Sequence, residues 1–565
     1  PGIIVDPNLI TCKEMMMDGD RAIAKILKAE GVEWMAAFPA QTLIDAAAME
    51  GIRPIICRQE RTGVNMADGY SRVMNGKKIG VFSMQRGPGA ENAFGGVAQA
   101  YADNVPILVL PGGHDRDKYD SHPGFDAVDH YGGITKWAGY ITNPERIPAL
   151  MGRAFSLLKH GRPAPVLVEI PTDVAVGDYP GRDVQYMPVK VQKSSANPDD
   201  VRDLVTDLLK AKAPVINAGQ GVMYAEATDD LIEFAELVNV PVMTTLAGKS
   251  AFPENHPLAL GTGGHSTTLM VARFLEATDF FLAVGAGLSD THFNSPTPQG
   301  VPIGQVTNAV DDLNKNVRLT HGAVGDAKLV LRQMIEEVKR QLGGSGRGDV
   351  NGVGEEVASI KAEFMTEWEP HLNSDEVPIS PYRVLTELAK AVDVEKAIVT
   401  HDSGYPREQF VPFWPVLKPH NYIGWGKSTQ LGYGLGLAIG AKLAKPDHHS
   451  INVMGDAAFG MSGLDIETAA RCNIGILTVV LNNGVMTHYD KHMPFSSKSH
   501  RTNVFGGDYA KVAEGLGAYS EQVETPDALA GAFKRAIDAN TAGQPALIEV
   551  MTKAEENVPN YLYEG

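Results

Sequence analysis

Two polar side chains that could bind a metal ion lie near the C-terminal end of the chain. Asp456 follows an apolar, strand-like run that ends in Gly455, and Asn483 follows a second such run after a helix-like segment. Because the carboxyl ends of neighbouring parallel strands share one edge of a sheet, we expect the two side chains to converge. Carboxylate and amide oxygens suit Mg²⁺, which often binds phosphate groups as well. The small residues Ala457 and Ala458 would let backbone N–H groups at a helix start approach those phosphates.

Each half of this pattern has a plainer interpretation, since Gly-Asp and Asn-Asn-Gly are both common turns. The conjunction of strand, helix and strand in this order favours a metal–diphosphate anchor. The region resembles the thiamine diphosphate (ThDP) motif, which opens with Gly-Asp-Gly and closes with Asn-Asn. That resemblance implies that Asp456 and Asn483 are the side-chain Mg²⁺ ligands and that Val485 supplies a carbonyl ligand. The third glycine of the motif is Ala457 here, which fits only if that position does not need positive φ.

A carboxylate for proton transfer is expected in another part of the chain. The segment PIICRQERTGVNMADGYSR resembles the strand–Glu–helix element of this superfamily, which places Glu60 in the catalytic position. There the carboxylate would protonate a ring nitrogen of the aminopyrimidine. Taken alone, Glu60 would rather be interpreted as a solvated residue at a helix N-terminus.

Two further N-terminal segments resemble acetolactate synthases and their relatives. The run RGPGAENAFGG closely resembles their Gly-Pro-Gly-Ala-x-Asn segment, and EWMAAFPAQTLIDA resembles the loop that carries Pro-Gly-Gly near the active site. Ala40 and Gln41 stand in place of the two glycines. Gln41 is therefore either a substrate-facing polar group or a plain loop residue.

Two C-terminal loops resemble the remaining cofactor contacts. In GWGKSTQLGYGLGLAIG, the resemblance makes Leu431 the bulky wedge under bent ThDP and the Thr429 carbonyl the acceptor for the aminopyrimidine amine. The glycines of this segment are interpreted as allowing close helix packing, because their spacing does not fit a dinucleotide fingerprint. In VTHDSGYPREQF, Ser403 and Gly404 are the expected diphosphate contacts.

Substrate-facing positions depart from acetolactate synthase. Where those enzymes show Phe-Gln-Glu, this chain has Phe-Asp-Ala, so Asp126 is either an acid, a base or a hydrogen-bond acceptor, or a polar loop residue. His488, shortly after Asn483, could move protons near neutral pH or lie on a surface helix. In the central part, AVGAGLSD lacks the Arg that acetolactate synthases carry beside their flavin. This argues against FAD and leaves an ADP or CoA portion open.

The bulk composition excludes some classes of partner. The chain has 565 residues and a formal net charge of -18, whereas a nucleic-acid partner needs clustered Lys and Arg. The N-terminus lacks the basic start and apolar core of a signal peptide, and no apolar run approaches the roughly 18 residues of a membrane span. Three cysteines without a CxxC pair favour a reducing, cytoplasmic protein.

Short apolar runs alternate with helix-like segments almost throughout, as parallel strands buried on both faces do. The expected class is α/β, with three doubly wound parallel-sheet domains. The resemblance implies a ThDP pyrimidine-binding domain at 1–185, a central domain at 198–342 and a ThDP diphosphate-binding domain at 355–565. It also implies a homodimer or homotetramer, in which Glu60 meets ThDP held by the partner's Asp456.

The resemblance as a whole is to the ThDP-dependent acetolactate synthase/oxalyl-CoA decarboxylase-like group. It implies a ThDP- and Mg²⁺-dependent lyase or carboligase that acts on a 2-oxo acid by decarboxylation and carboligation. A 2-hydroxyacyl-CoA lyase or oxalyl-CoA decarboxylase-like enzyme is the first alternative, and acyl-CoA cleavage would discriminate it. A non-catalytic homologue is a remote alternative, against which the presence of Glu60, Asp456 and Asn483 argues.

Overall fold

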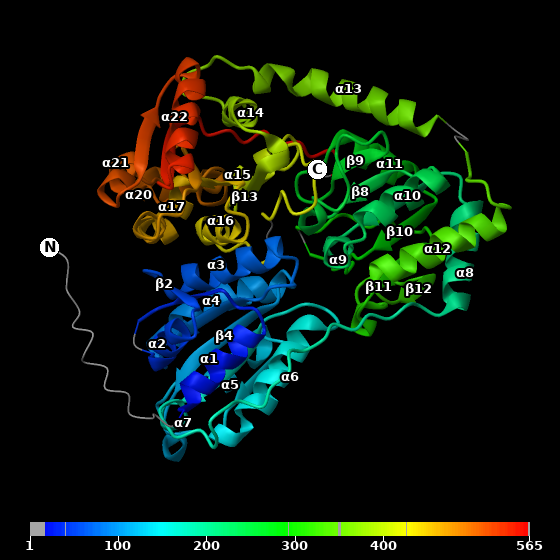
Figure 1. The fold of residues 1–565 in the computed structure, drawn as a ribbon. Coiled ribbons are helices and arrows are strands. Elements are labelled where there is room, and N and C mark those ends of the chain that lie inside the picture. Colours follow the sequence, from blue (N-terminus) through cyan, green and yellow to red (C-terminus); the bar gives the residue numbers. More distant parts are fainter. Residues whose placement is uncertain (1–16, 40, 292, 349–351, 425–426, 563–565) are drawn as a thin grey trace.

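The computed structural model describes residues 17–39, 41–291, 293–348, 352–424 and 427–562. Three parallel sheets follow one another along the chain (Figure 1), so the expected α/β class with three doubly wound domains is confirmed. Ala40, one of the two residues that replace a family glycine, lies outside the described residues. The domain limits expected from the sequence stay predictions. Among the described residues, no helix is both long and apolar enough to cross a lipid bilayer.

The N-terminal sheet has the strand order β2-β1-β3-β4-β6-β5. Its strands are β1 (Trp34–Ala37), β2 (Arg53–Ile56), β3 (Gly80–Met84), β4 (Ile107–Gly113), β5 (Trp137–Tyr140) and β6 (Val166–Pro171). Its helices are α1 (Gly19–Ala29), α2 (Thr42–Met49), α3 (Glu60–Val73), α4 (Pro88–Ala102), α5 (Ala127–Tyr131), α6 (Ile147–Lys159) and α7 (Thr172–Ala175). Successive residues of β3 pack on opposite faces, Phe82 with α3 and α4 and Val81 with α1 and α6, which explains the continuous apolar runs.

The central sheet has the order β12-β11-β10-β7-β8-β9. Its strands are β7 (Pro214–Ala218), β8 (Val242–Thr244), β9 (Ala259–Thr262), β10 (Phe280–Val284), β11 (Ile303–Thr307) and β12 (His321–Val324). Its helices are α8 (Pro198–Lys210), α9 (Gln220–Tyr224), α10 (Thr228–Val238), α11 (Leu269–Ala277) and α12 (Ala327–Gln341). Leu282 and Phe281 of β10 again belong to cores on opposite faces of the sheet.

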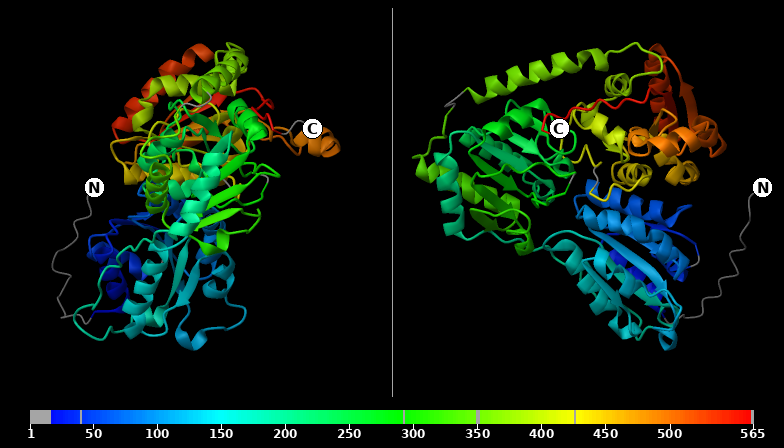
Figure 2. Two further views of the ribbon diagram at one scale, coloured as in Figure 1. Left: turned by 90° about the vertical axis from the view of Figure 1, so that its right-hand side faces the viewer. Right: turned by 180° about the vertical axis from the view of Figure 1, so that it is seen from behind.

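The C-terminal sheet has the order β13-β14-β15-β17-β16. Its strands are β13 (Ala397–His401), β14 (His449–Gly455), β15 (Leu477–Asn482), β16 (Tyr519–Val523) and β17 (Ala546–Met551). Its larger helices are α14 (Pro381–Ala391), α16 (Tyr433–Ala444) and α22 (Leu529–Thr541). Its shorter helices are α15 (Tyr405–Phe410), α17 (Asp456–Ser462), α18 (Ile466–Arg471), α19 (Tyr489–His492), α20 (Pro494–His500) and α21 (Tyr509–Gly515). The long helix α13 (Val353–Leu372) packs on α11 and α14 and so connects the central and C-terminal domains (Figure 2).

The N-terminal and C-terminal domains meet where α3 packs on α16 (Figure 1). A Cβ on Gly69 would lie 2.3 Å from the Leu437 carbonyl oxygen, and one on Gly440 would lie 2.1 Å from the Met66 carbonyl oxygen. Such an approach of two backbones leaves no room for a side chain. The interpretation of GYGLGLAIG as a helix-packing segment is therefore confirmed.

Candidate active site

The two motifs that opened the sequence analysis come together at one edge of the C-terminal sheet. Strands β14 and β15 are parallel neighbours, as expected, with Gly455 opposite Leu481. Asp456 starts α17 directly after β14, and its Oδ2 accepts a hydrogen bond from the Gly484 backbone N–H at 2.9 Å. The Asp456 carboxylate therefore lies against the Asn483–Gly484 turn. Burial raises the pKa of this carboxyl, because it disfavours the ionised form, and a nearby cation would offset that cost.

The Asn483 side chain is held by its own turn. Its Oδ1 accepts from the Val485 N–H at 3.0 Å, and its Nδ2 donates to Thr487 Oγ1 at 2.9 Å. Ala457 lies inside α17, so it has ordinary helical backbone geometry and does not need the positive φ that would demand glycine. Ala457 is therefore compatible with the motif despite replacing its third glycine.

A second loop at this edge has room for an anion. Gly404 has φ +87°, and a Cβ added there would meet no described atom within 4 Å. Because the loop leads straight into α15, the backbone N–H of Gly404 lies at the same end of the sheet as α17. This open glycine fits the diphosphate contact expected of Ser403 and Gly404.

Asp402 joins this loop to the loop expected to hold the aminopyrimidine. Its carboxylate is 0% exposed. Its Oδ1 accepts from the N–H groups of Ser403 and Gly432, both at 2.8 Å, and its Oδ2 accepts from the Gly434 N–H at 3.0 Å. Burial raises the pKa of Asp402 to about 6, and the three backbone donors oppose that rise. The sequence placed Asp402 in the loop but did not reveal this link.

The aminopyrimidine loop faces the N-terminal domain. Thr429 has φ +52°, and Leu431 packs against the core shared by α3, α4 and α16. The neighbouring Gln430 reaches α4, since a Cβ on Gly95 would lie 2.3 Å from its Nε2. The expected carbonyl and wedge residues thus lie at the junction of the two domains.

Glu60 is the first residue of α3 and is only 4% exposed. Its interpretation as a solvated residue at a helix start is therefore wrong. Asn92 Nδ2 donates to Glu60 Oε2 at 3.3 Å. Asn92 is a site residue that the sequence analysis did not single out, although it ends the quoted Gly-Pro-Gly-Ala-x-Asn segment. Burial, and after it the charge of Glu60, raise the pKa of Tyr131, whose hydroxyl group donates to the Ala90 carbonyl oxygen on α4.

Gln41 lies at the same edge of the N-terminal sheet. Its Oε1 accepts from Ser83 Oγ at 2.7 Å, where β3 ends. Its Nε2 faces the end of β4, 2.3 Å from where a Cβ on Gly112 would be. Gln41 is therefore a fixed polar group at the carboxyl ends of the strands. Its expected role toward substrate stays a prediction.

Asp126 lines a polar cleft of about 200 Å³ together with His114, His122, His130 and Glu169. Glu169, which the sequence did not single out, is almost fully buried in β6 and accepts from the Val128 N–H at 3.2 Å. Burial, with the charge of Asp126 adding to it, raises the pKa of Glu169 to about 7. Burial also raises the pKa of Asp126. This cleft can therefore hold protons near neutral pH.

His488 lies beside the C-terminal segment of the chain. Its Nδ1 is 3.5 Å from Glu556 Oε2, and its ring makes an edge contact with His492. The His488 side chain is 39% exposed. The structure thus gives His488 a carboxylate neighbour, and its role in proton transfer stays a prediction.

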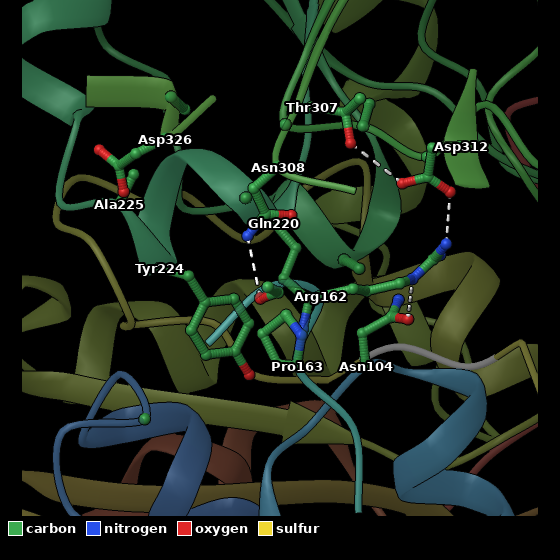
Figure 3. Close-up of a pocket in the computed structure, with 18 of the residues that line it drawn as sticks. Asn104, Arg162, Pro163, Gln220, Tyr224, Ala225, Thr307, Asn308, Asp312 and Asp326 are labelled. Carbon is green, nitrogen blue, oxygen red and sulfur yellow. Dashed lines mark hydrogen bonds and ion pairs between the residues drawn. The ribbon is translucent and has the colours of Figure 1, made fainter. Parts of the chain in front are cut away.

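A larger cavity of about 380 Å³ lies between the central and N-terminal domains (Figure 3). Arg162, from the N-terminal domain, forms an ion pair with Asp312, and its Nε donates to Asn104 Oδ1 at 2.6 Å. Asn308 Nδ2 donates to the Gly161 carbonyl oxygen at 3.0 Å. A Cβ on Gly287, within AVGAGLSD, would lie 3.2 Å from Arg162 Nη2. An arginine therefore does reach this segment, although the segment itself contains none.

This arrangement of three parallel-sheet domains, with Asp456 beside the Asn483–Gly484 turn at one sheet edge and a buried glutamate at another, defines a class of cofactor enzyme. Residues 17–132 match the family model of the thiamine pyrophosphate enzyme N-terminal TPP binding domain. Residues 201–334 match that of the central domain, and residues 402–550 that of the C-terminal TPP binding domain. The chain belongs to the thiamine pyrophosphate enzymes and is a ThDP-dependent enzyme.

The chain is similar to acetolactate synthases over almost its whole length. It is 30% identical to a probable acetolactate synthase large subunit of Methanococcus aeolicus, over 94% of this chain and 92% of that protein. It is 27% identical to the acetolactate synthase isozyme 3 large subunit of Escherichia coli K12, over 96% of both chains. It is also 29% identical to a glyoxylate carboligase of Escherichia coli O157:H7, over 90% of this chain and 88% of that protein.

Proposed function

We propose that the protein is a ThDP- and Mg²⁺-dependent carboligase that decarboxylates a 2-oxo acid and joins the remaining fragment to an acceptor carbonyl. The hydrogen bond from the Gly484 N–H to Asp456 carries this proposal, because it joins the two halves of the expected metal site. The similarity to two acetolactate synthases and to a glyoxylate carboligase supports the reaction class.

The chain offers a complete set of groups to hold the cofactor. Asp456, Asn483 and the Val485 carbonyl would bind Mg²⁺, a hard cation that prefers oxygen ligands. The backbone of Ser403, Gly404 and residues 455–458 would bind the diphosphate at two helix starts. Thr429 and Leu431 would orient the aminopyrimidine.

ThDP, when bound, supplies an acidic thiazolium carbon and an electron sink for the fragment left after CO₂ departs. The protein then supplies orientation and proton control. Glu60 would hold a proton against a ring nitrogen of the aminopyrimidine, and Asn92 would orient the Glu60 carboxyl through the contact to Oε2. Gln41, Asp126 and His488 are the proposed polar groups on the substrate side.

A second copy of the chain is proposed to complete the site. Exposed apolar side chains lie close to both of its halves, with Phe94 on α4 37% exposed and Met461 on α17 and Leu464 on η8 (Gly463–Asp465) 49% and 58% exposed. Clustered exposed apolar groups are typical of association surfaces. They support a homodimer or homotetramer with shared active sites.

An acyl-CoA lyase, of the 2-hydroxyacyl-CoA lyase or oxalyl-CoA decarboxylase kind, is the second candidate. The cavity of Figure 3 favours it, since Arg162, Lys193 and Lys427 line a space that could take the phosphates of an ADP or CoA portion. In this alternative the cavity binds the nucleotide end of the substrate or an ADP activator. We propose ADP or CoA for this cavity in preference to FAD.

The test is product analysis with the purified protein. ThDP, Mg²⁺ and pyruvate would be added together, and the products identified by mass spectrometry, with glyoxylate and oxalyl-CoA in parallel reactions. Acetolactate from pyruvate, or a carboligation product from glyoxylate, supports the first proposal. Consumption of oxalyl-CoA alone supports the second, and no consumption despite bound ThDP refutes both for these substrates.

A further inference from the structure

The turn at Arg58 and Gln59, the corner that leads into Glu60, is bound by a side chain from a different domain. Asp465, in η8 of the C-terminal domain, accepts from the Arg58 backbone N–H at 2.7 Å through its Oδ1. The same oxygen accepts from Thr468 Oγ1 at 2.9 Å, within its own domain. The two donors are 410 positions apart in sequence by their numbers, 58 and 468. The Asp465 carboxylate thus bridges the two domains two residues before Glu60.

Helix α3 needs such an external partner. Its N-cap residue is Gln59, whose side chain makes no capping hydrogen bond within the described part of the chain. A helix start without a side-chain cap is less well defined, because its first N–H groups lack acceptors. Asp465 compensates by fixing the residue just before the cap.

The contact is buried, which makes it strong. Asp465 is 1% exposed. Burial raises the pKa of its carboxyl, while the hydrogen bonds from the Arg58 amide and Thr468 oppose the rise. Both Asp465 and Glu60 act on the pKa of the buried Cys57 thiol, after the effect of burial itself, so the two carboxylates share one neighbour. A charge-assisted hydrogen bond in a dry environment is roughly twice as strong as a neutral one.

Other contacts between the same two segments are more exposed. Arg61 Nη2 donates to the Met461 carbonyl oxygen at 3.0 Å, and Arg471 Nη2 donates to the Ile56 carbonyl oxygen at 2.6 Å. Glu467 forms an ion pair with Arg58 at 3.6 Å, in which the arginine side chain is half exposed. Exposed pairs of this kind contribute little, from about 0 to 1 kcal/mol. Asp465 is therefore the main polar anchor of the corner.

We propose that Asp465 is a positioning residue for Glu60, acting from the C-terminal domain through the backbone of Arg58. The inference rests on the proposed function, in which Glu60 handles the proton on the cofactor. Because η8 directly follows α17, the helical segment that begins at Asp456 also fixes the helix that begins at Glu60. Within one chain, the sheet edge at Asp456 and the helix start at Glu60 are thereby held in one frame. In an oligomer with shared sites, these two groups of one chain serve two different active sites.

The first experiment compares D465A, D465N and the matched control E467Q in the holoenzyme. D465A should lower kcat by about 10²-fold, the loss that a displacement of 1 Å can cause, with KM and ThDP affinity little changed. D465N should recover much of this loss, since its amide oxygen can still accept from Arg58 and Thr468. E467Q should retain kcat, because it weakens only the ion pairs of Glu467 with the half-exposed side chains of Arg58 and Arg471.

Two further measurements separate positioning from general destabilisation. Hydrogen exchange of the peptide that contains Arg58 should quicken in D465A and not in E467Q. Deuterium exchange at the thiazolium carbon of bound ThDP should slow in D465A. A wild-type kcat in D465A, or equal losses in D465A and E467Q, would overturn the inference. So would a fall in ThDP affinity that accounts for the whole loss of turnover.

The double variant E60Q/D465A distinguishes this inference from the proposed function. If Asp465 acts through Glu60, D465A should add no further loss in the E60Q background. Full additivity would overturn the positioning role while leaving Glu60 as the proton-transferring group. An active E60Q enzyme would instead overturn the proposed function itself.

Discussion

The N-terminal and C-terminal domains present the same kind of edge, the carboxyl ends of parallel strands, but they hold their carboxylates differently. Asp402 and Asp456 in the C-terminal domain accept from backbone N–H groups of loops in their own domain. Glu60 in the N-terminal domain is held by the Asn92 side chain, and the turn before it is bound by Asp465 from the other domain.

The difference matches the tasks proposed for the two edges. A metal–diphosphate anchor must stay fixed, and backbone donors within one domain are rigid and hard to disturb by single substitutions. A group that moves protons must keep its position relative to a cofactor held elsewhere, so its supports come from more than one element. Substitutions at the C-terminal edge should therefore lower the affinity for the cofactor. Substitutions at the N-terminal edge should lower turnover while the cofactor stays bound.

The largest effect is expected for E60Q, which keeps the shape of the side chain and removes the titratable carboxyl. Turnover should fall by about 10²–10⁴-fold, the usual contribution of a general acid or base. ThDP binding, measured by calorimetry with Mg²⁺ present, should survive. Loss of cofactor together with turnover would contradict the contrast between the two edges.

The next effect is expected for D456A, which removes a proposed Mg²⁺ ligand. The affinity for ThDP in the presence of Mg²⁺ should fall by about 100-fold or more. Losing an outer-shell partner of a metal typically costs about 10–100-fold, and Asp456 would bind the metal directly. Asp490, an exposed aspartate on α19, gives a control, and D490A should bind ThDP like the wild type. Tight ThDP binding by D456A would show that the anchor lies elsewhere.

A smaller effect is expected for substitutions of Asp402. In D402A the three buried backbone donors lose their acceptor, so the free energy of unfolding should fall by on the order of 3 kcal/mol. D402N should lose less, since one acceptor oxygen remains, although its NH₂ group would then oppose the Gly434 N–H. Chemical denaturation of the protein without cofactor would measure both. Equal stability of D402A and wild type would exclude the link between the two loops.

The smallest effect concerns the cleft around Glu169 and depends on pH. Its pKa is raised from 4.5 to about 7, so the folded protein binds this proton more tightly than the unfolded chain. The resulting stability is fully present below the ordinary pKa and is lost as the pH rises through about 7. E169Q cannot lose this proton, so its melting temperature should fall less than that of the wild type between about pH 5 and 8. The exposed E91Q on α4 is the control, and parallel curves for E169Q and wild type would refute the raised pKa.

Much of the C-terminal site could be predicted from the sequence, and less of the N-terminal one. The pairing of β14 with β15 and the meeting of Asp456 with the Asn483 turn follow from strand, helix and strand in order. Asn92 was missed although its segment was quoted for its resemblance to acetolactate synthases, and Glu169 was missed because it lies within an apolar strand. The solvated alternative for Glu60 was wrong because the partners that bury it come from elsewhere in the chain.

The sequence by itself determined the three parallel sheets, since continuous apolar runs that alternate with helices can bury both faces only in such sheets. It also indicated close helix packing at α16, because the glycines that permit it are visible in the sequence, whereas its partner α3 is known only from the structure. Only the tertiary structure decided that Asp402 joins two loops and that Asp465 binds the corner before Glu60. The groups that each carboxylate reaches across these links are backbone N–H groups, which nearly every residue carries, so no residue type marks them in the sequence.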